Sequence, residues 1–419
     1  MRYDASAFMD ALMFKSHLRD DVFVAGGQPS ITYVKREETH IERQLARAIA
    51  TPNRIVSLSG PTKTGKTVLC RKVLGQREYV WIDGGEVKSD TNFWDQIRSE
   101  LRIATETTVS DGTDSGVSGG VNFVVTTANG SHLMKQSETK KFNGGLGEIL
   151  DHLQSGRIIV VVDDFHYIEK DHRVTLMRNM KGAVFNGLKV VLLSVTHRTF
   201  DAIEAETELT GRFSSVILPP WSRVDLEQIP RLGFDALNVK YGENLIGYLS
   251  GEAQESPFLM QKFCWEICFD SDIESSSMII KNKIDFEYDI EAMFTRLAKD
   301  AGLPVYQKLV TGPQSRKIRT KRPLHNGNEA DIYEATLLAI AETGPMPTIK
   351  YDDLRSKMNN IIEDKMPQKH EITSALKHLA AISRKSGAED AIDWDEDKRE
   401  IRACLIPENI GRFAARYAA

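Results

Sequence analysis

The feature that most constrains this chain is a glycine-rich loop of eight residues that follows an apolar strand. Residues 60–67 read Gly-Pro-Thr-Lys-Thr-Gly-Lys-Thr, a full match to the phosphate-binding P-loop pattern, and they come directly after the apolar run 55–59. In such a loop, backbone N–H groups surround a phosphate at a helix N-terminus, where unpaired donors and the helix dipole favour negative charge. The helical pattern from Val68 to Leu74 supplies that helix. The sequence therefore predicts a site for a nucleoside triphosphate.

The residue types in this loop also predict roles. The Lys66 ammonium is expected to reach the β- and γ-phosphates, and the Thr67 hydroxyl is expected to hold Mg²⁺. The expected cofactors are therefore ATP and Mg²⁺. The loop residues expected to contact the nucleotide are Gly60, Pro61, Thr62, Lys63, Thr64, Gly65, Lys66, Thr67 and Val68.

A pair of acids predicts the catalytic end of the site. Asp163 and Asp164 follow the apolar strand 158–162. A hydrolysing P-loop protein needs a carboxylate near the metal and a group that positions water. We expect Asp163 to bind Mg²⁺, directly or through water, and Asp164 to polarise the attacking water. Two acids at a strand end can also be turn formers or a helix N-cap.

Apolar runs at 55–59, 79–83, 158–162 and 190–195 alternate with helical patterns, and a last strand is expected around 216–218. Near-continuous Val and Ile strands alternating with helices predict an α/β fold, a P-loop parallel sheet of the ASCE type flanked by helices. Thr196 and Arg198 follow the fourth strand, where Arg198 could read the γ-phosphate charge or lie solvated in a loop. Arg212 precedes the final strand, where a cation could project into a neighbouring subunit.

Composition shifts divide the chain. Ser222 and Asp225 form a capping-box pattern that opens a helical region, and Pro257 marks another helix start. The segment 105–141 is rich in Ser, Thr and Gly and contains Asn129-Gly130, which indicates a hairpin or a flexible loop. The expected division is an N-terminal segment (1–30), an ATPase core (31–220), an all-α lid (221–300), a basic linker (301–328) and a winged-helix domain (329–419).

Charge and cysteine usage limit the partners. The chain has 419 residues with 54 basic and 59 acidic side chains, a net charge of -5, so any contact with nucleic acid must be local. Candidate double-stranded DNA contacts are the basic run 316–322 and the helix 371–385, although the acidic wing around Glu396 opposes phosphates and makes protein docking an equal alternative. The four cysteines fit reduced packing residues, and without an apolar run that could span a membrane a cytoplasmic location is expected.

Taken in order, these motifs resemble the AAA+/STAND class of ATPases. The segments are Tyr33-Val-Lys-Arg36, the P-loop, IIVVVDDFHYI, VLLSVTHR, GRF and SPFL, and the resemblance covers nearly the whole chain after about residue 20. Within the class, the chain is most similar to origin-recognition-like ATPases and bacterial STAND signalling ATPases.

This resemblance implies further roles. Tyr33, Val34 and Arg36 would lie near the adenine, and Thr196 and Arg198 would occupy the sensor position. Arg212 would act in trans, and Pro257 would be the lid proline that contacts nucleotide. The lid departs from the family pattern: Glu255 and Ser256 stand where a glycine is usual, and in place of a lid arginine only Gln261 or Lys262 follows.

Three functions remain open from the sequence. The first is an ATP-hydrolysing switch in signalling or defence, with self-association through the core and a protein partner or effector encoded separately. The second is a DNA-assembling ATPase of the origin-recognition or transposition-regulator kind. The third is a nucleotide-stabilised scaffold that hardly turns over and in which Asp164 is dispensable.

Overall fold

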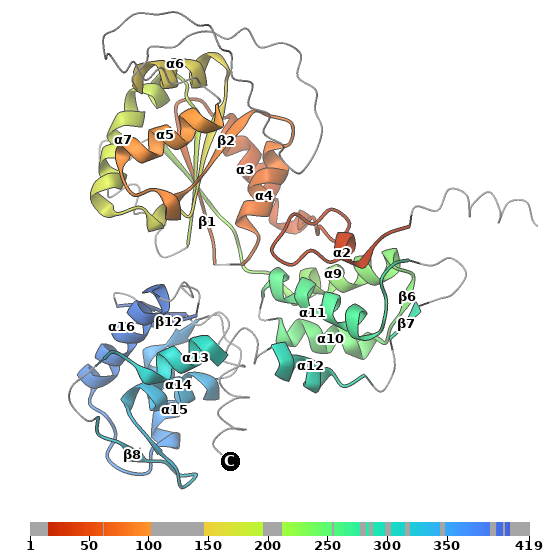
Figure 1. Cartoon of the computed structure of the whole chain (residues 1–419), viewed down its shortest axis with the longest axis vertical. Helices are drawn as coiled ribbons and strands as arrows, with labels where there is room; N and C mark the ends of the chain where they lie inside the picture. Colours follow the sequence, from red (N-terminus) through yellow and green to blue (C-terminus); the bar gives the residue numbers. More distant parts are fainter. Residues whose placement is uncertain are drawn as a thin grey trace, which may run out of the picture.

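The structure is a computed structural model. It describes residues 16–61, 63–101, 146–195, 212–253, 255–276, 282–284, 288–297, 303–314, 319–343, 348–385, 391–396 and 399–402. These form an α/β core, a helical lid and a C-terminal unit (Figure 1). The expected insertion at 105–141, together with Thr62, Thr196 and Arg198, lies outside the described residues. No described helix is long and apolar enough to cross a bilayer.

The core is built on a parallel sheet of five strands in the order β2-β3-β4-β1-β5, which confirms the predicted fold class. The central strands of a parallel sheet with both faces covered bury side chains on both faces, which explains the Val and Ile runs. The unbroken burial of β1 and β4 shows this directly. The strands are β1 (Ile55–Ser59), β2 (Tyr79–Asp83), β3 (Ile159–Asp163), β4 (Val190–Ser194) and β5 (Phe213–Ile217).

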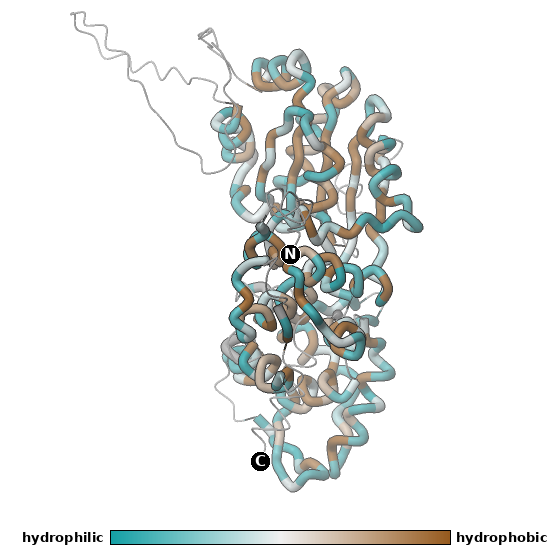
Figure 2. Tube along the Cα trace, turned by 90° about the vertical axis from the view of Figure 1, so that its right-hand side faces the viewer, coloured by the Kyte–Doolittle hydropathy of each residue, from teal (hydrophilic) through white to brown (hydrophobic). Residues whose placement is uncertain are grey.

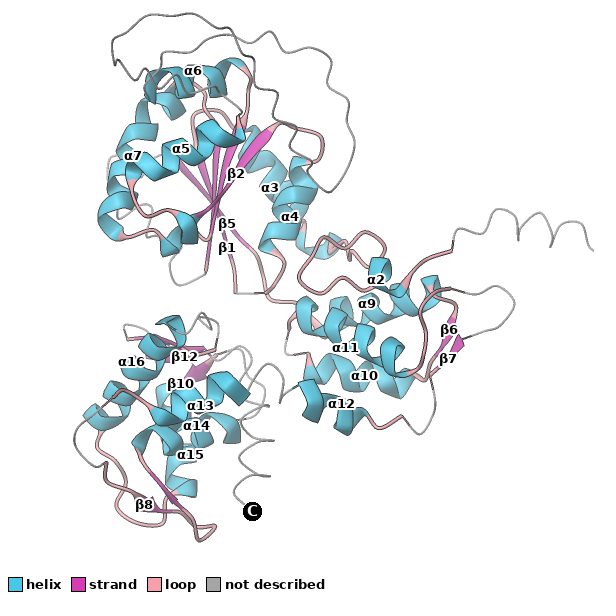
Figure 3. Ribbon diagram, in the orientation of Figure 1, coloured by secondary structure: helices cyan, strands magenta, loops and turns pink. Residues whose placement is uncertain are grey.

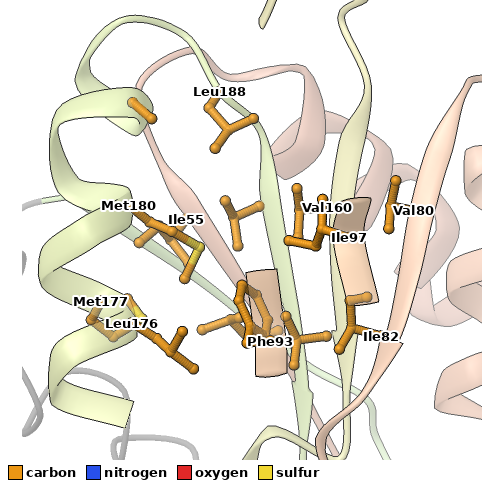
Figure 4. Close-up of a cluster of buried hydrophobic side chains, with 14 of the residues drawn as sticks. Ile55, Val80, Ile82, Phe93, Ile97, Val160, Leu176, Met177, Met180 and Leu188 are labelled. Atoms are coloured by element: carbon orange, nitrogen blue, oxygen red, sulfur yellow. The ribbon is translucent and has the colours of Figure 1, made fainter. Parts of the chain in front are cut away.

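Five helices of the described part of the core cover the two faces of this sheet. One face packs against α3 (Ile41–Ala50) and α4 (Lys66–Leu74). The other packs against α5 (Asp90–Glu100), α6 (Leu146–Ser155) and α7 (Lys170–Phe185), and Figure 4 shows side chains of α5 and α7 pointing at those of the strands. Apolar residues follow the strands and polar residues the outer helix turns (Figure 2). Full burial of each Val, Leu or Ile contributes about 1.5–3 kcal/mol, so both faces hold the sheet in place.

The lid follows β5 and consists mainly of helices (Figure 3). The Ser222 hydroxyl accepts a hydrogen bond from the Asp225 N–H at 3.1 Å, so the cap predicted from the sequence is present. A short parallel pair, β6 (Val239–Lys240) with β7 (Asn282–Lys283), was not expected in this region. The helices are α9 (Arg223–Ala236), α10 (Glu243–Glu252), α11 (Pro257–Asp270) and α12 (Ile290–Leu297).

Residues near the N-terminus pack into the lid rather than standing apart as a separate segment. After α2 (Arg19–Val22), Val22 and Phe23 join the core of the lid helices. Gly233 in α9 makes room for this contact, because a Cβ there would lie 2.2 Å from the Phe23 ring. The described part of the 1–30 segment therefore belongs with the lid.

The C-terminal unit has a core of its own. Three of its strands form an antiparallel sheet in the order β10-β12-β11, and four described helices precede β11. The winged-helix assignment of this unit stays a prediction. Part of the segment 301–328, which we expected to be a linker, belongs to the C-terminal unit instead, because Leu309 and Leu324 are buried in its core. The elements are α13 (Leu303–Thr311), β8 (Arg322–Pro323), β9 (Glu329–Ala330), α14 (Ile332–Glu342), β10 (Ile349–Lys350), α15 (Tyr351–Ile361), α16 (Lys369–Lys385), β11 (Asp393–Asp395) and β12 (Glu400–Arg402).

Candidate functional site

A cavity of about 510 Å³ lies where the P-loop, the end of β3 and the lid meet. This volume falls in the range of about 300–1,000 Å³ that is usual for small-molecule sites. Most residues that the sequence predicted for the nucleotide line it together. They are Tyr33, Val34, Arg36, Lys63, Thr64, Gly65, Lys66, Thr67, Val68, Asp163, Asp164 and Pro257.

The P-loop connects β1 to α4 and is held by its own side chains. The buried Lys66 ammonium donates to the Gly60 carbonyl at 3.1 Å and the Pro61 carbonyl at 2.9 Å. The Thr64 hydroxyl donates to the same Pro61 carbonyl at 2.7 Å. Gly60 and Pro61 thus contribute their carbonyl oxygens as hydrogen-bond acceptors. Among the described residues of the loop, Lys66 is the buried cation, and it lies at the N-terminus of α4. A positive group at a helix N-terminus suits an anionic ligand.

Thr67 and Asp163 lie side by side at the expected metal position. The Thr67 hydroxyl donates to Asp163 Oδ2 at 2.9 Å, and the Asp164 N–H donates to Asp163 Oδ1 at 3.0 Å. Burial raises the pKa of Asp163, opposed by these two hydrogen bonds and by the Lys66 charge. A hydroxyl and a carboxylate fit Mg²⁺, which binds through one or two carboxylates and completes its shell with phosphate and water oxygens. Among the described residues, no group of three or more His, Cys, Asp or Glu could hold a metal ion.

Asp164 adopts a left-handed backbone conformation with φ of 48° and begins the short 3-10 helix η3 (Phe165–Tyr167). The end of β2 lies so close that a Cβ on Gly84 would be 2.5 Å from the Asp164 carbonyl oxygen. Only glycine allows this approach, so Gly84 fixes the turn that carries Asp164. The signal for this approach in the sequence is the glycine pair Gly84-Gly85 after the second strand.

Two side chains of the N-terminal wall of the cavity, Tyr33 and Arg36, form hydrogen bonds with other parts of the chain. The Tyr33 hydroxyl donates to Glu42 Oε1 at 2.8 Å, and burial raises the pKa of Tyr33. The Arg36 guanidinium donates to the Pro219 carbonyl at 2.9 Å and the Pro220 carbonyl at 3.1 Å, and burial lowers its pKa. Arg36 therefore lines the cavity, but these hydrogen bonds hold the connection between core and lid.

The lid contributes Pro257, Phe258 and Gln261 to the cavity. The Lys63 ammonium lies 4.8 Å from the centre of the Phe258 ring, which joins the P-loop to α11. Gln261 Oε1 accepts from the Val24 N–H at 3.1 Å, and its Nε2 donates to the Thr32 hydroxyl at 2.7 Å. The amide thus ties the N-terminal residues to the lid. Lys262, the other candidate, pairs with Glu266 at 2.8 Å.

Arg212 lies away from this cavity, at the start of the edge strand β5. Its guanidinium carbon is 4.8 Å from the centre of the exposed Phe185 ring. Arg212 does not line the cavity of its own chain, and its expected action in a neighbouring subunit stays a prediction. Sequence reasoning missed Trp221, Phe258 and Tyr167, which also line the site.

Several solved structures are similar to this chain. The Walker-type ATPase PABY2304 of Pyrococcus abyssi is 15% identical with a TM-score of 0.52, and the match covers 91% of this chain and 96% of that one. The ORC2 protein of Aeropyrum pernix is 14% identical with a TM-score of 0.49, covering 95% and 98% of the two chains. RuvB of Thermotoga maritima is 11% identical with a TM-score of 0.41, covering 88% and 92%. No protein-family model and no curated protein matches the sequence. At these identities the first match shows the Walker-type ATPase fold alone.

Proposed function

We propose that this chain is an ATP-binding and ATP-hydrolysing switch of the AAA+/STAND class, in which Mg-ATP binds between core and lid. One observation carries the proposal: the P-loop, both acids of the β3 end and the lid proline line a single cavity of about 510 Å³. A ligand that touches core and lid at once can favour one arrangement of the two, which is what a switch requires. Nucleotide-controlled self-association or partner docking would follow, in a signalling or defence system.

The residues of the cavity divide the chemical work. Lys66 would exchange its carbonyl partners for the β- and γ-phosphates, and the backbone N–H groups of residues 63–67 would bind the remaining oxygens. Thr67 and Asp163 would hold Mg²⁺, which neutralises phosphate charge when bound. Asp164 would orient and polarise the attacking water. Thr196 and Arg198 at the sensor position, and Arg212 acting from a neighbouring subunit, complete the proposed set.

The C-terminal unit is proposed to dock a protein partner. Its helix α16 presents Lys377, but that ammonium pairs with Glu396 beyond β11 at 2.8 Å. A carboxylate on this surface repels phosphates and reduces the charge available to DNA. Docking to DNA through 371–385 and 316–322, as in an origin-recognition-like or transposition-regulator ATPase, is the alternative.

The test is ATP binding and hydrolysis by the purified full chain, compared with Lys66→Ala and Asp164→Ala. Lys66→Ala should abolish binding, whereas Asp164→Ala should bind ATP and lose turnover by a factor of about 10² or more. Double-stranded DNA is added over a salt series. Turnover that is indifferent to DNA supports the protein-docking switch, whereas DNA-stimulated turnover that falls with salt supports the alternative. Tight binding with no turnover in any condition would mean a scaffold.

A further inference from the structure

A hydrogen bond connects the main chain of the P-loop to the start of the lid. The Trp221 indole N–H donates to the Thr64 carbonyl oxygen at 2.9 Å. Trp221 immediately precedes Ser222, the N-cap of α9, and its ring packs against the core of the lid. The position of the first lid helix is therefore linked directly to the loop that binds phosphate.

The geometry of the peptide bond gives this contact a consequence for the ligand. The Thr64 carbonyl and the Gly65 N–H belong to one peptide unit, and no described residue has a cis peptide bond. In a planar trans peptide the C=O and N–H point in opposite directions. The indole therefore fixes the carbonyl on its own side and the Gly65 N–H on the opposite side. Gly65 is the residue that leads into α4, where phosphate donors are needed.

The backbone conformation of Gly65 bears on how freely this peptide can turn. Gly65 has φ of +90°, in the left-handed region that favours glycine, and a Cβ built on it would meet nothing within 4 Å. Glycine explores both signs of φ at little cost, which makes a flip of the Thr64–Gly65 peptide easy. The hydrogen bond from Trp221 stabilises one of the two orientations.

Arg36 in turn holds the indole. Its guanidinium carbon lies 4.7 Å from the centre of the Trp221 ring. The same guanidinium donates to the Pro219 and Pro220 carbonyls, the two residues before Trp221. Arg36 is only 7% exposed, and a buried, multiply bonded guanidinium is a rigid support. Tyr33 and Val34, from the same segment as Arg36, line the cavity beside it.

We propose that Trp221 is a positioning residue for the nucleotide: its N–H orients the Thr64–Gly65 peptide for phosphate binding, and Arg36 holds the indole against the lid connection. This inference rests on the proposed ATP site. It deepens that site by naming the contact through which the lid and the phosphate loop sense each other. Weakening the contact lowers nucleotide affinity without touching Lys66, Thr67 or the acids.

The test compares two Trp→Phe changes. Trp221→Phe keeps an aromatic ring beneath Arg36, although a smaller one, and removes the N–H donor. Trp265→Phe is the matched control, because the Trp265 indole also donates a hydrogen bond, to Asp20 at 2.7 Å, but on the outside of the lid. We expect Trp221→Phe to raise the Kd for Mg-ATP about three- to tenfold, the usual effect of one hydrogen bond. Trp265→Phe should stay within about twofold of wild type. Turnover should show a raised KM with kcat nearly unchanged, since phosphate contacts of this kind bind ground and transition states alike.

The outcomes separate the inference from the proposed function. If wild type binds ATP, Lys66→Ala does not, and Trp221→Phe binds as wild type does, the positioning role is overturned and the ATP site stands. If wild type does not bind ATP, the proposed function itself fails. Should Trp221→Phe not fold, wild-type protein with ¹⁵N-labelled indoles decides: the Trp221 N–H must exchange slowly with solvent and shift on addition of Mg-ATP, while that of Trp394 in the C-terminal unit does not. A freely exchanging Trp221 N–H contradicts the proposal.

Discussion

The Thr67 hydroxyl and the Asp163 carboxylate, 2.9 Å apart, join the first turn of α4 to the end of β3. The two side chains come from segments separated by 96 positions in the sequence and meet at the edge of the sheet. Each has a second task in the proposed site, because both are oxygen ligands of the kind that Mg²⁺ prefers. The contact therefore makes the metal position part of the packing between helix and strand.

Changing Thr67 separates the hydroxyl from the shape of the side chain. Thr67→Val keeps the volume and removes the donor, and it should lower the affinity for Mg-ATP at least tenfold while affinity for ATP in EDTA changes little. Thr67→Ser, which keeps the hydroxyl, is the control and should stay near wild type. Titrations of ATP with and without Mg²⁺ measure the difference. Equal losses in both titrations would place Thr67 outside the metal site.

The ionised carboxylate of Asp163 should destabilise the folded state at neutral pH. Burial raises its pKa, so the folded state holds the proton more tightly than the unfolded state does. Between the unfolded value of 3.8 and the folded pKa, stability therefore falls as pH rises, and the loss remains at higher pH. Asp163→Asn removes the charge and should raise the melting temperature at pH 7 in the absence of nucleotide. The gain should shrink as the pH is lowered toward 3.8.

Asp163→Asn also provides its own functional control. The variant should lose Mg²⁺-dependent nucleotide binding, since a neutral amide is a poor ligand for a hard cation. Thermal scans at several pH values, with and without Mg-ATP, measure both effects. A variant that is less stable than wild type at pH 7 would contradict the raised pKa of Asp163.

Parts of the fold and of the site could be predicted because their signals are local. The bounds of β1 and β2 coincide with the apolar runs 55–59 and 79–83, and Asp163 and Thr67 lie in short motifs with fixed spacing. Trp221, Gln261 and Phe23 could not be assigned, since each acts on residues distant in the sequence. The partner of Trp221 lies 157 positions away, and a partner of Gln261 lies 237 positions away. Neither hydrophobic periodicity nor motif spacing in the sequence can predict contacts between residues so far apart.

Gln261 should be needed for the attachment of the N-terminal residues to the lid. Gln261→Leu preserves the approximate volume but leaves the Val24 N–H without its partner and removes the contact with Thr32. We expect a loss of about 1–3 kcal/mol in the free energy of unfolding, the cost of an unmade buried hydrogen bond. Gln44→Leu on the exposed side of α3 is the control and should change stability by less than about 0.5 kcal/mol. Urea unfolding measures the stability of both variants. Equal losses would contradict the role of Gln261 in attaching the N-terminal residues to the lid.

Two glycine substitutions should have opposite signs. Gly233→Ala places a methyl group 2.2 Å from the Phe23 ring and should destabilise the chain by about 1–3 kcal/mol through overpacking. Gly182→Ala in α7 meets nothing within 4 Å and should stabilise it by about 0.5–1 kcal/mol through helix propensity. Thermal unfolding of the two variants measures the contrast. Similar stabilisation by both would mean that Phe23 does not pack against α9.

Binding of double-stranded DNA by the C-terminal unit should be weak. Lys377 pairs with Glu396 at 2.8 Å, with 52% and 64% of the two side chains exposed, so the pair itself stabilises little but cancels a charge on the outer face of α16. We expect the full chain to bind a random 30-base-pair duplex no more tightly than ordinary non-specific binding, about 10⁻⁴–10⁻⁶ M at physiological salt.

Glu396→Gln frees the Lys377 ammonium and tests whether this acid limits the contact with phosphate. The variant should bind the same duplex more tightly, and the slope of log K against log salt should steepen by about 0.9, the value for one additional phosphate contact. Asp352→Gln, on α15 beside Arg399 at 3.7 Å, is the matched control for losing one acid elsewhere in the unit. Fluorescence anisotropy over a salt series gives both quantities. Nanomolar binding by wild type that Lys377→Ala abolishes would instead make α16 a DNA-binding helix, and the proposed protein partner would give way to the DNA-assembling ATPase.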